Sequence, residues 1–156
     1  DLPELFRDAR RLGLTTSLDT NYDPAGRWEL GDMLNQCDVF LPNAAEALAI
    51  SGAADLPAAL DVLAGRTPTL AVKLGSDGGL ARQGSTEGRA RPLPVAVVYT
   101  VGAGDSFDAG FLCGYLNGWP LERALRLALA CGSLSTTAAG GTAAQPTMME
   151  ALAAME

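Results

Sequence analysis

The chain has 156 residues, of which 48% are hydrophobic and 19% charged, and its net charge is −7 at pH 7. This composition predicts a folded globular domain, and the lack of any basic run or long apolar run argues against nucleic-acid and membrane partners. Because histidine is absent and the three cysteines lie far apart, common zinc sites and histidine-based triads are excluded, and we expect reduced thiols in a cytoplasmic protein.

The first half of the chain alternates between helical and extended patterns. Apolar residues recur at helical spacing from Leu2 to Leu12, and Gly13 is typical of a helix end. Residues 23–26 carry turn chemistry. In order, we expect a helix over 2–13, a strand over 14–21, a helix over 32–36, a strand over 37–43, and helices over 44–52 and 56–66.

The second half adds a strand-like run, a hairpin and two longer helices. Residues 69–75 are typical of a buried strand, and residues 80–84 and 88–94 of antiparallel strands joined by a Gly/Ser-rich turn. We also expect a strand over 95–100, helices over 104–117 and 121–137, a glycine loop over 138–147 and a final helix from Met148. This alternation predicts an α/β fold, with a mostly parallel sheet and helices on both faces, in a single domain over 1–156.

Four polar or glycine-rich segments fall at the expected carboxyl ends of strands. Ligands of parallel α/β sheets bind at those ends, where segments from several strands meet. We therefore expect one binding rim formed by residues 18–21, 40–43, 72–78 and 98–105.

The segment Gly102-Ala103-Gly104-Asp105 carries the most specific chemistry. Glycines let a ligand approach the backbone closely, and amides at a helix start bind anions. Asp105 beside such a cradle could take a proton from an attacking hydroxyl, as in phosphoryl transfer. The alternative is that Asp105 and Asp108 only stabilise the helix start. The residues by themselves leave both interpretations open.

Three other segments each have a structural and a functional interpretation. Asn43 and Glu46 have the spacing of a helix capping box, but could also arrange phosphate oxygens and a hydrated Mg²⁺. Residues 73–79 form a glycine-rich turn that suits either a strand connection or a surface under a nucleotide. Asp19 and Asn21 suit either turn formation or polar contacts on the rim.

Together these motifs resemble the PfkB (ribokinase-like) family of carbohydrate kinases. TVGAGDSFDAGFL at residues 100–112 is similar to that family's carboxyl-terminal signature, in which an anion hole precedes the catalytic aspartate. NAAE at 43–46, VKLGSDGG at 72–79 and AAGGTAAQPT at 138–147 resemble its Asn-x-x-Glu motif, its nucleotide-binding turn and its late loop near the adenine. The motifs follow the family's order, from about Asp19 to the end of the chain.

The resemblance implies ATP and Mg²⁺ as cofactors and a sugar or sugar-like molecule as acceptor. Asp105 would deprotonate the acceptor hydroxyl, and residues 102–104 would bind the transferred phosphoryl group through their amides. Asp105, Asp19 and Asn21 would contact the substrate, and Glu46 would hold Mg²⁺ through water. The residues implied in nucleotide binding are Asn43, Lys73, Gly75, Ser76, Asp77, Gly78, Gly140, Gly141 and Thr142.

Two positions and one region depart from the family's pattern. Tyr99 stands where many members have an aspartate that helps to hold a monovalent cation, which puts such a site in doubt. Lys73 stands where several members have threonine, a change that bears on phosphate contacts rather than on the turn. The family's amino-terminal portion, with most sugar contacts and the lid, has no counterpart in this sequence.

A carboxyl-terminal portion alone would lack acceptor positioning and water exclusion. We therefore expect the parent function to be sugar phosphorylation, and these residues in isolation to have little or no activity. The alternatives are a non-catalytic nucleotide-binding or regulatory module, or a structural domain without a ligand. Such a portion would also expose a sheet edge and apolar surface, which a missing amino-terminal half or another protomer would cover.

Overall fold

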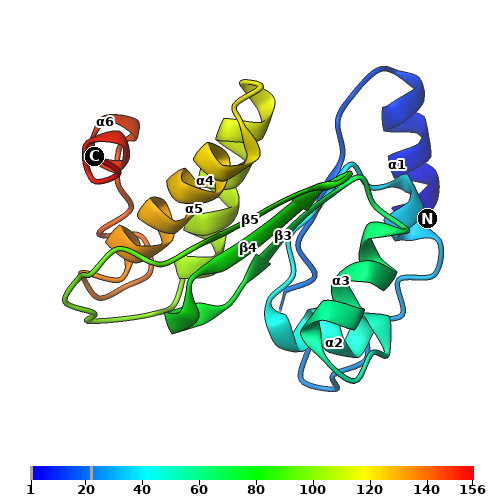
Figure 1. Ribbon diagram of the computed structural model, residues 1–156, viewed down its shortest axis with the longest axis horizontal. Coiled ribbons are helices and arrows are strands. Elements are labelled where there is room, and N and C mark those ends of the chain that lie inside the picture. The colour runs from blue at the N-terminus through cyan, green and yellow to red at the C-terminus, as the bar shows by residue number, and fades with distance from the viewer. Residues whose placement is uncertain (1, 22) are drawn as a thin grey trace. The chain divides into compact units, whose positions relative to one another are not determined.

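The computed structural model describes residues 2–21 and 23–156. Within the described residues no single helix has both the length and the apolar composition of a membrane span, although the bent pair of helices over 44–51 and 56–64 meets these criteria jointly. The elements in chain order are α1 Leu2–Arg11, β1 Ser17–Leu18, the 3₁₀ helix η1 Met33–Gln36, β2 Val39–Phe40, α2 Ala44–Ser51, α3 Leu56–Ala64, β3 Thr69–Lys73, the 3₁₀ helix η2 Gly75–Asp77, β4 Gly79–Gln83, β5 Thr86–Ala90, α4 Ala103–Leu116, α5 Leu121–Ser135 and α6 Met148–Ala153 (Figure 1).

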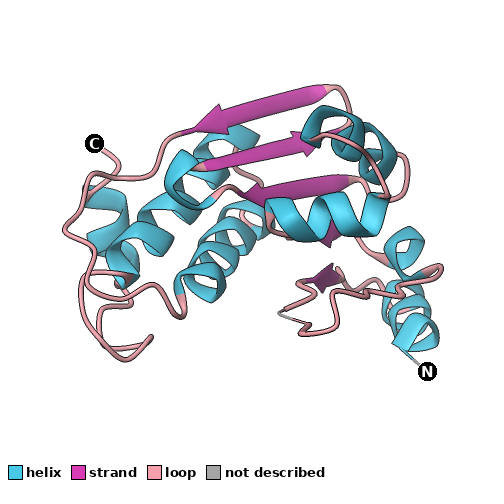
Figure 2. Cartoon of the chain, turned by 90° about the horizontal axis from the view of Figure 1, so that it is seen from below, coloured by secondary structure: helices cyan, strands magenta, loops and turns pink. Residues whose placement is uncertain are grey.

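The strands form one mixed sheet in the order β1-β2-β3-β4-β5. The first three strands are parallel, with Ser17 opposite Val39 and Val39 opposite Thr69. A two-residue turn joins β4 and β5, which run in opposite directions (Figure 2). Because β1 and β2 are parallel, the residues that follow them leave the sheet at the same edge.

By its contacts the chain divides into two compact units. Unit 1 consists of Asp1–Val72 and Arg82–Thr86, and unit 2 of Lys73–Ala81 and Glu87–Glu156. The predicted helices at α1 to α6 and the β4–β5 hairpin are confirmed to within a few residues. The expected helix over 32–36 is instead a single 3₁₀ turn, in which the Cys37 amide donates to the carbonyl three residues earlier. The first two strands are shorter than predicted, with two paired residues each.

The strand predicted over residues 95–100 is wrong, because this segment is a loop. Val97 and Val98 are 62% and 61% exposed, so their β-prone side chains have no sheet surface to pack against. The amides of Val98 and Tyr99 both donate to the carbonyl oxygen of Thr136, at 2.8 and 3.0 Å. A helix end thus takes the hydrogen bonds that a neighbouring strand would have taken, and the glycine motif follows a loop rather than a strand.

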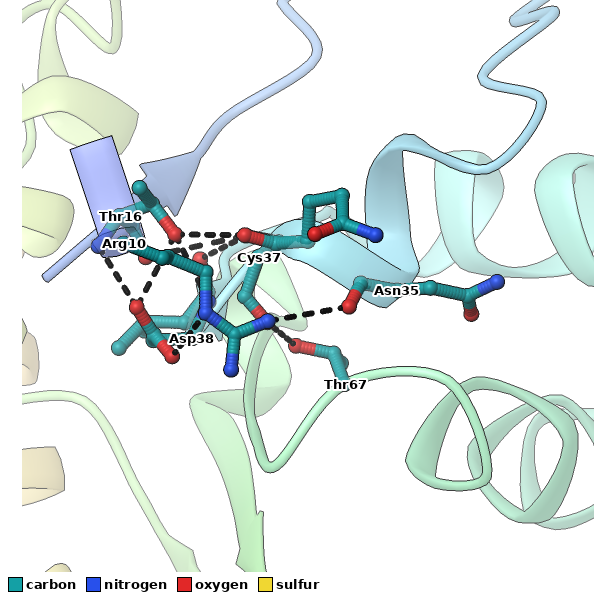
Figure 3. A network of polar contacts seen from close by, with 8 residues as sticks. Arg10, Thr16, Asn35, Cys37, Asp38 and Thr67 are labelled. Carbon is teal, nitrogen blue, oxygen red and sulfur yellow. Dashed lines mark hydrogen bonds and ion pairs between the residues drawn. The ribbon is translucent and has the colours of Figure 1, made fainter. Parts of the chain in front are cut away.

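A polar network ties the segment before β1 to the segment before β2 in unit 1 (Figure 3). The Asp38 carboxylate accepts hydrogen bonds from the amide of Thr16 at 2.9 Å and from its hydroxyl at 3.0 Å, and Nε of Arg10 lies 3.5 Å from the other carboxylate oxygen. The Thr67 hydroxyl donates to the Cys37 carbonyl at 3.0 Å. Burial raises the pKa of the Cys37 thiol to about 11, so this cysteine is held as an inert thiol.

Replacing Asp38 with Ala is expected to lower the free energy of unfolding by about 2 kcal/mol, because the buried Thr16 amide and hydroxyl lose a charged acceptor. Urea unfolding followed by circular dichroism measures the change. The matched control is Asp8→Ala, which removes an exposed ion pair with Arg11 and should change stability by less than about 0.5 kcal/mol. Equal stability of the two variants would show that the network contributes nothing.

Unit 2 is organised around the antiparallel pair α4 and α5, which lie side by side in Figure 1. Glycines allow their backbones to approach closely. A Cβ atom on Gly110 would lie 2.9 Å from Cα of Ala128, and one on Gly114 would lie 2.8 Å from Cα of Ala124. This contact packs α4, whose first turn carries the glycine motif, closely against α5.

Candidate active site

The first turn of α4 has amide groups available to an anion. The amide of Ala103 donates to the carbonyl of Thr100 at 3.2 Å. The amides of Gly104 and Asp105 have no acceptor among the described residues. Because a helix start also carries roughly half a positive charge, these two amides can bind a phosphate oxygen. The Asp105 side chain is exposed beside them.

The late glycine loop supports the turn that begins α4. Gly102 has a φ of 85°, and a Cβ atom there would lie 2.4 Å from the carbonyl oxygen of Gly141. A Cβ atom on Gly141 would in turn lie 3.3 Å from the carbonyl oxygen of Val101. The Thr142 amide donates to the carbonyl of Gly140 at 2.9 Å and closes the loop. This loop therefore contacts the backbone of the turn that begins α4.

The glycine-rich turn after β3 also forms as predicted. Gly75, Ser76 and Asp77 make up η2, and Gly78 follows with a φ of 92°. A Cβ atom on Gly78 would lie 2.1 Å from the carbonyl oxygen of Ala90, so only glycine allows the turn to pass this close to the end of β5.

Lys73, the last residue of β3, forms an ion pair with Asp108 in the second turn of α4. Its Nζ atom lies 3.0 Å from both carboxylate oxygens, and the two side chains are only 14% and 12% exposed. A Cβ atom on Gly104 would lie 3.8 Å from Cδ and 4.0 Å from Nζ of Lys73. The ammonium group is therefore held beside the free amides of α4.

A pocket of about 580 Å³ in unit 2 opens next to this ion pair. Its walls come from the η2 turn, the loop before α4, and the facing sides of α4 and α5, and they are mainly apolar. Lys73, Ser76 and Gly104 also line it, as do Ser133 and Thr136 of α5. An apolar pocket lined by a lysine and by Gly104, whose amide is free, suits a ligand with a flat ring and a phosphate chain.

Asn43 and Glu46 form the predicted capping box at the start of α2, in unit 1. The Glu46 carboxylate accepts from the amide of Asn43 at 2.9 Å and from its side chain at 2.6 Å, and the Glu46 amide donates back to the Asn43 side chain at 2.9 Å. The structural interpretation of this motif is therefore confirmed. Its roles toward phosphate and Mg²⁺ stay predictions.

Asp19 and Asn21 follow β1 and form a turn, also in unit 1. The Asp19 carboxylate accepts from the Asn21 amide at 3.1 Å, and Asn21 has a φ of 53°, which confirms the turn interpretation. Their contact with a substrate stays a prediction. Tyr99, in unit 2, is 43% exposed, and the expectation that it disfavours a monovalent-cation site stays a prediction.

Asp108 is the residue whose position the sequence analysis underestimated. The sequence offers for it only the alternative that it stabilises the helix start, yet it is buried and paired with a residue 35 positions earlier. One signal was present in the sequence: Asp108 lies four residues after Gly104, so both fall on the same face of the helix. The partner of Asp108 on that face could not be read from spacing.

The sequence matches the pfkB family of carbohydrate kinases over residues 4–148. The 2-dehydro-3-deoxygluconokinase of Bacillus subtilis is 31% identical over 153 residues, a match that covers 92% of this chain and 47% of that protein. The 2-dehydro-3-deoxygalactonokinase of Haloferax volcanii is also 31% identical over 153 residues, with 90% of this chain and 47% of that protein covered. The chain thus spans about half the length of these curated relatives.

Solved structures show the same architecture. The Arabidopsis thaliana ribokinase in complex with ribose and ATP superposes with a TM-score of 0.86 at 24% identity, over 99% of this chain and 51% of that one. An Escherichia coli protein assigned to the ribokinases, in complex with ATP and Mg²⁺, gives 0.86 at 23% identity, over 96% and 51%. The α/β, ribokinase-like fold predicted from the sequence is confirmed. The chain belongs to the pfkB family of carbohydrate kinases.

Proposed function

We propose that this chain is the nucleotide-binding portion of a kinase that transfers a phosphoryl group from ATP to a hydroxyl of a sugar or sugar-like acceptor. The observation that carries the proposal is the first turn of α4, where the free amides of Gly104 and Asp105 and the exposed Asp105 carboxylate lie together. Amides there neutralise charge on the transferred group, and the carboxylate accepts the proton of the acceptor hydroxyl.

The pocket of unit 2 would take the nucleotide. Its apolar walls suit the base, and Lys73 and Gly104 suit the phosphates. Ser133 and Thr136 of α5 would border the base, whereas the loop over 140–142 would act by holding the turn at Gly102. We assign the loop this supporting role because its contacts are with the backbone of the turn that begins α4.

Magnesium fits this chain only as an ion held mainly by the nucleotide. No group of three acidic, cysteine or histidine side chains that could hold a metal occurs among the described residues. Both Glu46 carboxylate oxygens already accept hydrogen bonds within the capping box, and the residue is 4% exposed. Mg²⁺ usually keeps several waters and binds one or two carboxylates together with phosphates, so Glu46 would act on it through water.

The acceptor side of the proposal extends beyond this chain. Asp19 and Asn21 would supply polar contacts to the acceptor, and residues 1–156 would be one partial domain that an amino-terminal half or another protomer completes. A non-catalytic nucleotide-binding module is the second candidate, because the pocket and the free amides of unit 2 could bind a nucleotide without an acceptor site.

Calorimetric titration of this chain with ATP and Mg²⁺ tests the binding site. We expect one nucleotide per chain, and at about 100 times its dissociation constant ATP should raise the free energy of unfolding by about 2.7 kcal/mol. Transfer of labelled γ-phosphate is then measured on sugars and 2-dehydro-3-deoxy sugar acids, with the chain alone and with the amino-terminal half of the Bacillus subtilis relative added. Binding with transfer supports the kinase, binding without transfer supports the module, and no binding rejects both.

A further inference from the structure

The Lys73–Asp108 pair has no clear purpose as a stabilising contact. Removing two charges from water opposes their mutual attraction, so a buried ion pair is weak evidence of stability. At 14% and 12% side-chain exposure, both groups bear most of that penalty. Because burial opposes this ion pair, its presence indicates that one of the two charges is needed at this position.

The place is the start of α4. Nζ of Lys73 would lie 4.0 Å from a Cβ atom on Gly104, and both residues line the same pocket. Asp108 is not among the described residues that line this pocket. It lies one helical turn after Gly104, and its carboxylate contacts the ammonium group through both oxygens at 3.0 Å.

Electrostatics explains why a lysine here needs a partner. The first turn of α4 carries roughly half a positive charge, which repels an ammonium group beside it. Without Asp108, no carboxylate at this position would offset that repulsion of the flexible Lys73 side chain. With Asp108, the ammonium and the free amides are held on one side of the pocket before any ligand arrives.

We propose that Asp108 is a positioning residue that holds Lys73 against the phosphate chain of the nucleotide, so that the pocket selects nucleoside di- and triphosphates over the nucleoside. This inference rests on the proposed function and adds Asp108 to it. Two effects of Asp108 oppose each other. Its negative charge alone would repel phosphate, whereas its hold on Lys73 promotes phosphate binding. If the hold on Lys73 dominates, removing the Asp108 carboxylate lowers the affinity for ATP, and if the repulsion dominates, it raises that affinity.

The test is calorimetric titration of the whole chain with ATP, ADP and adenosine in the presence of Mg²⁺. Lys73→Met should weaken ATP and ADP binding at least about tenfold, the scale of one charged hydrogen bond, and leave adenosine binding within about twofold. Asp108→Asn should weaken ATP binding by about fivefold, because the amide no longer attracts the ammonium. Lys73→Arg keeps the charge and should restore most of the affinity.

A double-substituted chain separates positioning from folding. Lys73→Met with Asp108→Leu removes both charges of the pair together, so it should fold, and it should bind ATP no more weakly than Lys73→Met alone, because without Lys73 the Asp108 charge can only repel the phosphates. Arg82→Met is the matched control, since Arg82 also forms an ion pair, with Asp61, and neither residue lines the pocket; this variant should bind ATP as the parent chain does.

If the Asp108→Asn variant binds ATP as tightly as the parent chain, or more tightly, this inference is overturned. So would a loss of adenosine affinity in Lys73→Met equal to the loss of ATP affinity. In both cases the parent chain still binds ATP, so the proposed function stands. A parent chain that binds no nucleotide rejects the proposed function and this inference together.

Discussion

Asp105→Asn is expected to reduce phosphoryl transfer by about 10²- to 10⁴-fold, because the amide cannot accept the proton of the acceptor hydroxyl. ATP affinity should be unchanged or slightly higher, since the free amides of Gly104 and residue 105 are kept and one negative charge near the phosphates is lost. Phosphoryl transfer is measured either with the chain alone or with the amino-terminal half of the relative added, whichever shows transfer for the parent chain. ATP binding to this chain is measured by calorimetry.

The control for Asp105→Asn is Glu122→Gln. Both substitutions neutralise an exposed carboxylate in the first turn of a helix, so each should lower helix stability by about 0.3–1 kcal/mol. Glu122 lies in the first turn of α5 and does not line the pocket, so its variant should keep transfer. If the Asp105 variant also keeps transfer, Asp105 is not the base, and its role is limited to the start of α4.

Gly102→Ala and Gly104→Ala should have opposite effects on stability although they lie two residues apart. At Gly102 the backbone φ is 85° and a Cβ atom would lie 2.4 Å from the carbonyl oxygen of Gly141, so alanine should lower the free energy of unfolding by about 3 kcal/mol. At Gly104 the nearest atoms would be 3.8 Å away, in Lys73. Alanine fits there and should raise stability by up to about 0.5 kcal/mol, because it favours helix.

In Gly104→Ala, ATP binding should weaken although the stability of the chain does not fall. The new methyl group would occupy the space between the Lys73 ammonium and the helix amides, where we place the phosphates, so Gly104→Ala should weaken ATP binding about tenfold in a chain that is at least as stable. Urea unfolding and calorimetry on the same samples give both quantities. Unchanged ATP binding in Gly104→Ala would exclude phosphate from this part of the pocket.

Local features of the site were predictable from the sequence because they depend on spacing along a helix. The capping box at Asn43 and Glu46 needs only two residues three positions apart, and the helix start at Gly102-Ala103-Gly104 needs only glycines before an amphipathic segment. The start of α4 was placed within one residue, and with it the candidate base Asp105. The order of these motifs also indicated the family that the comparisons confirm.

The error at residues 95–100 shows where local preference fails. Valine-rich segments favour strands only when a sheet surface and a pairing edge are present, and here the amides instead bond to the end of α5. The predicted lengths of β1 and β2 were wrong for a related reason, because pairing between strands, rather than composition, sets how far a strand extends.

By itself, the sequence determined the helices, the hairpin and the position of the glycine motif, because these depend on hydrogen bonds between near neighbours. The order of the motifs along the chain indicated the family. Only the tertiary structure decided that Lys73 meets Asp108, that Gly141 packs on Gly102, and that α5 lines the pocket beside α4. These contacts join residues far apart in the chain, so they depend on how side chains of several elements fill the same space. Spacing along the sequence contains no record of that packing.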